Sequence, residues 1–143
     1  SVEIKAAVIS SDEREGAQRA ILNAGHTIAH GLELASHYRL PHGEAVALGL
    51  VAECRIAERM GLGAPGLAGR VQSLLRALGL PTRSGRGVQV ARVLEAMLHD
   101  KKNRAGEVRL ALPASLGTMH EGEGRWTVPV TEDLLAAAVA GLA

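Results

Sequence analysis

Residues 19–50 read RAILNAGHTIAHGLELASHYRLPHGEAVALGL, and their pattern is that of two helices joined by a short connector. Apolar residues recur at the three- and four-residue spacing of a helix on both sides of the connector. Pro41 fixes the backbone in a conformation suited to the first turn of a helix. The pattern therefore predicts one helix over about 14–37 and a second over about 41–60.

The first of these helices carries a polar stripe along one side. At 100° per residue, an arc of roughly 80° holds the five residues Arg19, Asn23, His26, His30 and Glu33. The other positions are nearly all apolar or small, which predicts burial of the remaining sides, with an irregularity near Asn23 and Gly25. A solvated stripe is one interpretation, although such stripes usually consist of Lys and Glu. Arg, Asn and His bind anions, ligate metals and move protons, so their presence favours a lined cavity.

Three histidines of this segment are candidates for metal chemistry. His26 and His30 are four residues apart, a spacing that lets two imidazoles converge on one ion but that also occurs by chance. His42 begins the second helix. It is either an ordinary helix-entry residue or, if the two helices form a hairpin, a neighbour of the first helix. Three histidines with no carboxylate would suit a catalytic Zn²⁺ that keeps an open coordination position.

Composition limits the class of protein. The chain has 143 residues, of which 47% are apolar and none is Phe, so we expect a single helical domain over 1–143 with an aliphatic core. The net charge of +1, with signs that alternate along the chain, gives no electrostatic case for nucleic acid or an anionic membrane as partner. Cys54 is the only cysteine, which excludes a disulfide framework and favours a cytoplasmic setting. No apolar run is long enough to span a bilayer.

The other elements complete a mainly α fold. The pattern predicts a short helix over 2–9 with a helix cap at 10–13, helices over 66–79 and 88–99, a loop over 82–87, a polar turn over 100–106, and a last helix capped by Thr131. Alternation predicts strands over 107–112 and 125–130 that pair like a hairpin, giving a small β element near residues 107–130.

Taken together, the motifs resemble 3-dehydroquinate synthase. The runs RAILNAGHTIAHGLE (19–33) and LPHGEAVALGL (40–50) carry the resemblance, which extends through KAAVISSDEREG (5–16) and LHDKKNRAGEVRLALPASLG (98–117). Members of this family have an N-terminal NAD-binding domain and an α-helical C-terminal domain, so the resemblance implies the fold of the second domain, with the first one missing. The abrupt start at Ser1, inside a helical pattern, agrees with a piece of a longer protein.

The resemblance implies an activity in the shikimate pathway. Family enzymes convert 3-deoxy-D-arabino-heptulosonate 7-phosphate to 3-dehydroquinate and phosphate. NAD⁺ transiently oxidises one carbinol, phosphate is eliminated, the ketone is reduced again, and an intramolecular aldol step closes the carbocycle. The expected cofactors are NAD⁺ and a divalent metal, Zn²⁺ or alternatively Co²⁺. The expected partners are the sugar-phosphate substrate, the NAD-binding domain and a second copy in a homodimer. The 143-residue chain alone is expected to show no turnover.

The resemblance also assigns the metal ligands. His26 and His42 match the two metal-binding histidines of the family, and the third ligand is a glutamate that would precede Ser1. His30 matches a histidine that lies beside the substrate and helps in proton transfer. Because an imidazole must be neutral to bind a metal, metal affinity should fall at acid pH.

Further positions match substrate contacts of the family. The matched residues are Lys5, Arg19, Asn23 and one lysine of the DKK run, Lys101 or Lys102, and the resemblance makes Lys5 a candidate catalytic residue as well. Arg19 suits a carboxylate through its two-pronged guanidinium group. Glu15 matches a position assigned as a proton acceptor, although an acidic residue near a helix start is equally often a cap.

Several alternatives remain open. The chain could belong to another sugar-phosphate cyclase, such as a 2-deoxy-scyllo-inosose synthase, to an iron-dependent polyol or alcohol dehydrogenase, or to a non-catalytic helical metal-binding module. Arg19, Asn23 and the DKK run favour the dehydroquinate enzyme. Among other residues, Cys54 is predicted to be a buried hydrophobe, Glu53 a surface residue, Glu44 either a surface residue or a supporting group near the metal, Trp126 a packing residue, and His37, His99 and His120 structural or exposed residues.

Overall fold

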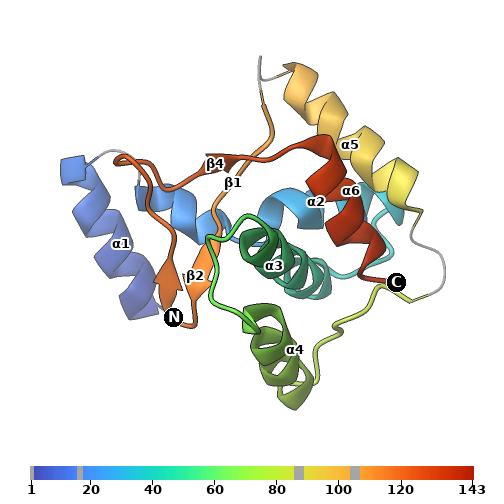
Figure 1. Ribbon diagram of the computed structural model, residues 1–143, viewed down its shortest axis with the longest axis horizontal. Helices are drawn as coiled ribbons and strands as arrows, with labels where there is room; N and C mark the ends of the chain where they lie inside the picture. The colour runs from blue at the N-terminus through green and yellow to red at the C-terminus, as the bar shows by residue number, and fades with distance from the viewer. Residues whose placement is uncertain (1, 16–17, 86–88, 104–106) are drawn as a thin grey trace.

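The computed structural model describes residues 2–15, 18–85, 89–103 and 107–143, with side chains except at 11–15 and 100–103. The helices are α1 (Val2–Glu15), η1 (Gln18–Asn23, a 3₁₀ helix), α2 (His26–Ala35), α3 (His42–Arg59), α4 (Leu67–Ala77), α5 (Val90–Asn103) and α6 (Glu132–Ala140). The strands are β1 (Arg109–Leu110), β2 (Pro113–Ser115), β3 (Thr118–Met119) and β4 (Val128–Pro129). The prediction of a mainly α fold with a small β element is confirmed (Figure 1).

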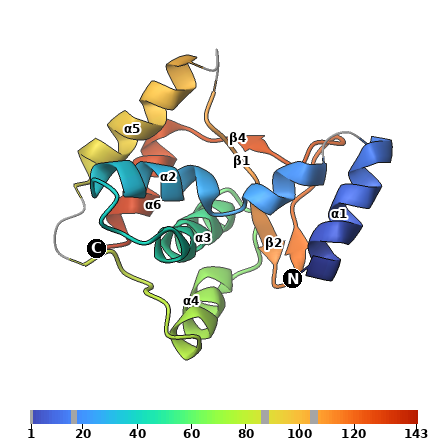
Figure 2. The same cartoon turned by 180° about the vertical axis from the view of Figure 1, so that it is seen from behind.

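Helix α3 forms the centre of the core. Its buried residues lie on almost every side of the helix and include Leu48, Val51 and Ile56, which have no solvent exposure. Helices α2, α4 and α6 pack against it, and α5 packs against α2 and α6. Figure 1 and Figure 2, which view the molecule from opposite sides, both place α3 in the middle of these helices and α1 at the end opposite to α5. Small residues such as Ala45, Ala52 and Ala57 on α3 allow this close approach.

A tight turn reverses the chain between α2 and α3. Two consecutive residues that are not glycine, His37 and Tyr38, have left-handed backbone angles, with φ of 54° and 57°. The Tyr38 N–H donates to the Glu33 carbonyl at 2.7 Å, which closes the last turn of α2. Left-handed backbone is costly for such residues and is usually held in place by the surrounding structure. The turn returns the chain to α2, so the two helices form the hairpin that would make His42 a neighbour of the first helix.

The prediction of a single helix over 14–37 is wrong, but the predicted irregularity near Asn23 and Gly25 is confirmed, because the helix is interrupted there. Helix α1 continues to Glu15, the 3₁₀ helix η1 follows the two undescribed residues 16 and 17, and α2 begins only at His26. The cause is Gly25, which has φ of 79° and ends the helical path. The backbone of Gly25 lies against Gly49 of α3 so closely that a Cβ on Gly49 would stand 2.0 Å from the Gly25 oxygen. Tertiary contact with α3 therefore determines where α2 begins.

Other boundaries also differ from the prediction. The proposed cap at 10–13 lies inside α1, and the polar turn over 100–106 is helical as far as Asn103, while 104–106 lie outside the described residues. The predicted helix start at Val88 lies outside the described residues too, and α5 is described from Val90.

The β element is only partly as predicted. The antiparallel pairing of 107–112 with 125–130 is confirmed in shortened form, with Leu110 opposite Val128. The β2–β3 hairpin between them, with Pro113 opposite Met119, was not predicted. The Thr131 cap is confirmed, because its hydroxyl accepts from the Leu134 N–H at 3.4 Å. Within the described ranges, no helix has the length and apolar character needed to cross a membrane.

Candidate metal and substrate site

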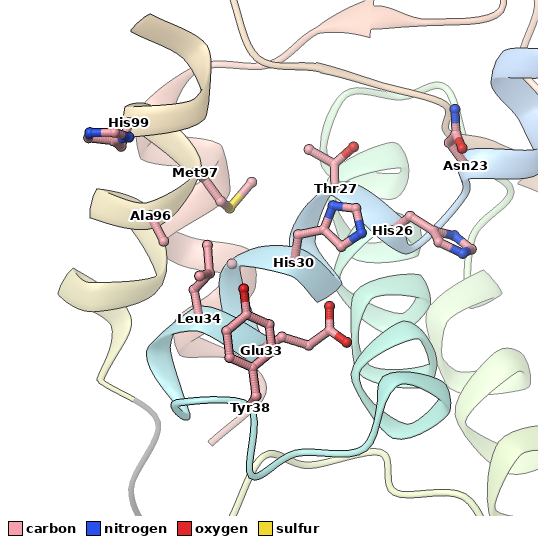
Figure 3. A pocket seen from close by; sticks show the side chains of 11 residues that line it. Asn23, His26, Thr27, His30, Glu33, Leu34, Tyr38, Ala96, Met97 and His99 are labelled. Carbon is pink, nitrogen blue, oxygen red and sulfur yellow. The ribbon is translucent and has the colours of Figure 1, made fainter. Parts of the chain in front are cut away.

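A cleft of about 740 Å³ lies between α2 and α5. It is lined by Asn23, His26, Thr27, His30, Gly31, Glu33, Leu34, Tyr38, Ala96, Met97 and His99. Figure 3 shows His26 and His30 extending from α2, with Met97 and His99 on the facing helix α5 and Asn23 at the end of η1. Three residues of the predicted stripe that lie on α2, His26, His30 and Glu33, therefore line a cavity, as does Asn23 on η1.

Three histidine rings lie close together, and two of them, those of His26 and His30, line this cleft. The ring centres of His26 and His42 are 5.4 Å apart, and the ring of His30 lies 6.4 Å from each of them. His26 is the first residue of α2 and His42 is the first residue of α3, so both side chains extend from helix N-termini. The turn at His37 and Tyr38 returns the chain to α2, and the side chains of His26 and His42 approach each other across the two helices.

Hydrogen bonds fix the orientation of two of these rings. The Nδ1–H of His26 donates to the Ala24 carbonyl at 3.1 Å, and the Nδ1–H of His42 donates to the Glu33 carboxylate at 2.9 Å. A carbonyl or ionised carboxylate oxygen can only accept, so Nδ1 carries the proton in each neutral ring. Nε2 then carries the lone pair. Metal-binding histidines typically show this arrangement, with the other nitrogen bonded to a carbonyl or carboxylate.

The donor set fits a divalent metal, but it is not complete within the described residues. Two neutral imidazoles suit Zn²⁺ or Co²⁺, which also require at least one further protein ligand. Nowhere in the described part of the chain do three His, Cys, Asp or Glu side chains have an arrangement that could hold a metal ion. The two histidines can therefore supply part of a metal site, and another ligand has to come from elsewhere.

The remaining predicted site residues either do not line the cleft or have side chains outside the described residues. Arg19 is exposed on η1, the short helix that ends at Asn23, but it is not among the residues that line the cleft. Lys5 is exposed on α1 and does not line the cleft either. The side chains of Glu15, Lys101 and Lys102 lie outside the described residues. Their roles stay predictions.

Sequence reasoning missed Glu53, whose assignment to the surface is wrong. Its side chain on α3 has no solvent exposure, and its Oε2 accepts a hydrogen bond of 2.5 Å from the Gly25 N–H. Among the described atoms, Oε1 has no hydrogen-bond partner. Burial raises the pKa of Glu53 to about 8, and the bond from Gly25 opposes the shift. The sequence offered no signal for this contact, because its partner is a backbone group 28 positions away.

The other assignments agree better with the structure. Cys54 is fully buried, as predicted, and burial raises the pKa of its thiol to about 12, with smaller contributions from Glu53 and Glu58. His37 and His99 are exposed and His120 is half-buried, although His99 also lines the cleft. Glu33 belonged to the predicted stripe, but its bond to His42 was not foreseen, nor were Tyr38 and Met97 as part of the cleft.

The fold is that of the helical C-terminal part of the sugar-phosphate cyclases. The family model described as 3-dehydroquinate synthase C-terminal matches residues 1–103. The chain belongs to this family. A 3-dehydroquinate synthase from a Synechococcus species is 46% identical over 118 residues, which cover 82% of this chain and 32% of that protein.

Solved structures of related cyclases share the fold. A 2-deoxy-scyllo-inosose synthase complexed with carbaglucose-6-phosphate, NAD⁺ and Co²⁺ superposes with a TM-score of 0.79 at 25% identity, over 96% of this chain and 38% of that one. A 2-epi-5-epi-valiolone synthase from Streptomyces hygroscopicus with NAD⁺ and Zn²⁺ bound gives 0.67 at 27%, over 84% and 32%. The chain spans about a third of the length of the curated relatives it matches.

Proposed function

We propose that this chain is the metal- and substrate-binding part of a 3-dehydroquinate synthase, which converts 3-deoxy-D-arabino-heptulosonate 7-phosphate to 3-dehydroquinate and phosphate. The observation that carries the proposal is the pair His26 and His42, whose rings lie 5.4 Å apart with both Nδ1 atoms hydrogen-bonded. Family membership supports the choice of reaction, because the curated relatives at 42–46% identity are 3-dehydroquinate synthases. NAD⁺ would be bound by a domain outside this chain.

In this proposal, His26 and His42 hold a divalent metal through Nε2, and a glutamate outside the chain completes the site. When bound, the metal orients the substrate hydroxyls and polarises the carbon that NAD⁺ oxidises. The two related cyclase structures contain Co²⁺ and Zn²⁺, respectively, which supports either ion. Anchoring of both Nδ1 atoms keeps the rings in the tautomer that can bind.

The other predicted site residues act on the substrate. His30 is exposed and lies 6.4 Å, ring centre to ring centre, from both proposed ligands, so it can reach a substrate held by the metal and move a proton at Nε2 or Nδ1. The amide of Asn23 faces the same space and can bind a hydroxyl (Figure 3). Arg19, Lys5 and a lysine at 101 or 102 would bind the carboxylate or phosphate, with Glu15 as a candidate proton acceptor. A cytoplasmic homodimer belongs to the same proposal.

The direct test uses the full-length enzyme that contains this chain. Incubation with the heptulosonate phosphate, NAD⁺ and Zn²⁺ should release phosphate and dehydroquinate, with no net consumption of NAD⁺. Glucose 6-phosphate, which lacks the carboxylate, serves as the control substrate for a cyclase of the inosose type. Phosphate release from the control alone would contradict the proposal. The 143-residue chain by itself should give no turnover.

Removing the carboxylate that supports His42 should weaken metal binding. Glu33 is nearly buried, with 12% of its side chain exposed, and its bond to Nδ1 holds the ring of His42 in place. We expect Glu33→Ala to reduce the affinity of the full-length enzyme for Co²⁺ about 10- to 100-fold. Glu95→Ala, which changes an exposed glutamate on α5, is the matched control. Equal Co²⁺ affinities of the two variants in a spectroscopic titration would rule out a supporting role for Glu33.

A further inference from the structure

The buried carboxyl group of Glu53 is not explained by packing alone. It occupies a fully buried position on α3 and forms one hydrogen bond, from the Gly25 N–H to Oε2, while Oε1 has no partner among the described atoms. Burying a carboxyl group costs free energy unless its hydrogen bonds compensate. A Leu or Met side chain would fill the same space at no such cost. The single bond to Gly25 is therefore the feature that distinguishes Glu53 from an apolar residue at this position.

The bond to Gly25 reaches His26 through one peptide group. The N–H of Gly25 and the C=O of Ala24 belong to the same planar unit, so fixing the direction of one fixes the other. That carbonyl accepts the Nδ1–H of His26 at 3.1 Å. Glu53 thus stands at one end of a chain of two hydrogen bonds, and the imidazole of His26 stands at the other end. Hydrogen bonds in such a chain polarise one another, which makes the carbonyl a better acceptor.

We infer that Glu53 is a positioning residue for His26, and that it sets the orientation of this ring through the Ala24–Gly25 peptide group. The inference rests on the proposed function, in which His26 binds the metal. Each of the two proposed metal ligands is then held in its orientation by a glutamate. Glu33 bonds directly to Nδ1 of His42, and Glu53 acts on Nδ1 of His26 through the backbone. Glu53 itself does not touch metal or substrate.

The contacts around Gly25 agree with this role. The Gly25 carbonyl accepts the Ala29 N–H at 3.0 Å as the first bond of α2, and its oxygen lies against Gly49 of α3. The left-handed backbone of Gly25 also leaves its N–H outside the helical pattern. Without Glu53, this buried N–H would lose its acceptor, and the peptide group could rotate to find another.

The test compares two substitutions of similar volume in the full-length enzyme. Glu53→Gln keeps an oxygen that can accept from Gly25, whereas Glu53→Met keeps the volume and removes the acceptor. We expect Glu53→Met to lower Co²⁺ affinity about tenfold and to alter the Co²⁺ absorption spectrum. Glu53→Gln should stay within about twofold of the wild type. Wild-type affinity in a folded Glu53→Met variant would overturn the inference.

A control variant separates an effect of Glu53 on the His26 ring from general destabilisation of the fold. Leu135→Ala, in the buried face of α6, should lower the melting temperature and leave Co²⁺ affinity unchanged. If Glu53→Met does not fold, Glu53→Asp replaces it, because its carboxylate is one methylene too short to keep the same bond. Wild-type Co²⁺ affinity in Glu53→Asp would then overturn the inference. Failure of the proposed function gives a different result, namely unchanged Co²⁺ binding after His26→Ala.

Discussion

Replacing Gly49 by alanine should destabilise the protein more than any other single-methyl change on α3. The added Cβ would stand 2.0 Å from the Gly25 oxygen and 2.9 Å from the Gly25 carbonyl carbon. Both contacts are with backbone, which cannot move aside as a flexible side chain can. Relief requires α2 and α3 to separate, at a cost of about 3 kcal/mol or more. The melting temperature of the full-length enzyme should fall by several degrees.

A second glycine on the same helix provides the control. A Cβ on Gly43 would meet nothing within 4 Å, and alanine has the higher helix propensity. Gly43→Ala should therefore leave the melting temperature unchanged or raise it slightly. The Gly49 variant should also lose Co²⁺ affinity, because the displaced backbone is the one that precedes His26. Similar melting temperatures for the two variants would show that the close contact between Gly25 and Gly49 is not present in solution.

The sequence predicts α3, α4 and α6 well because local chemistry marks their ends. Pro41 precedes α3, Gly61 follows it with φ of 69°, and the Thr131 hydroxyl caps α6. Each of these residues acts on its own backbone or on neighbours within a few positions, so single-sequence reasoning can detect them. The hairpin of α2 and α3 follows from the same signals, and with it the approach of His42 to His26.

The sequence predicts an irregularity near Gly25, but not the complete break in the helix that the structure shows there. A lone glycine inside a helical pattern costs only about 1 kcal/mol, so the pattern alone favours a continuous helix. The break is stabilised by contacts with Gly49 and Glu53, which lie on another helix. The burial of Glu53 was missed for the same reason, since a glutamate is almost always exposed unless a partner satisfies it. The strands β2 and β3 are too short for alternation to reveal them.

Substitutions of the three histidines are expected to have the largest effects on activity, because each histidine has its own proposed role. In the full-length enzyme, His26→Ala and His42→Ala should each weaken Co²⁺ or Zn²⁺ binding by more than about 100-fold. Removing a ligand lowers metal affinity more than removing the group that orients the ligand. Turnover should fall with the metal content. His37→Asn is the matched control, since this exposed histidine has a left-handed backbone that asparagine tolerates. It should leave both quantities unchanged.

His30→Ala should behave differently from either ligand variant. The centre of its ring lies 6.4 Å from the ring centres of His26 and His42, and the residue is exposed and lines the cleft. We expect metal affinity within a few-fold of the wild type and a fall in kcat of about 10²- to 10⁴-fold, the range for loss of a proton-transfer group. Metal content by elemental analysis and kcat at saturating Zn²⁺ separate the two effects. If His30→Ala loses its metal while His42→Ala retains it, the metal is bound by His26 and His30 of α2, and the proposed pairing of His26 with His42 is wrong.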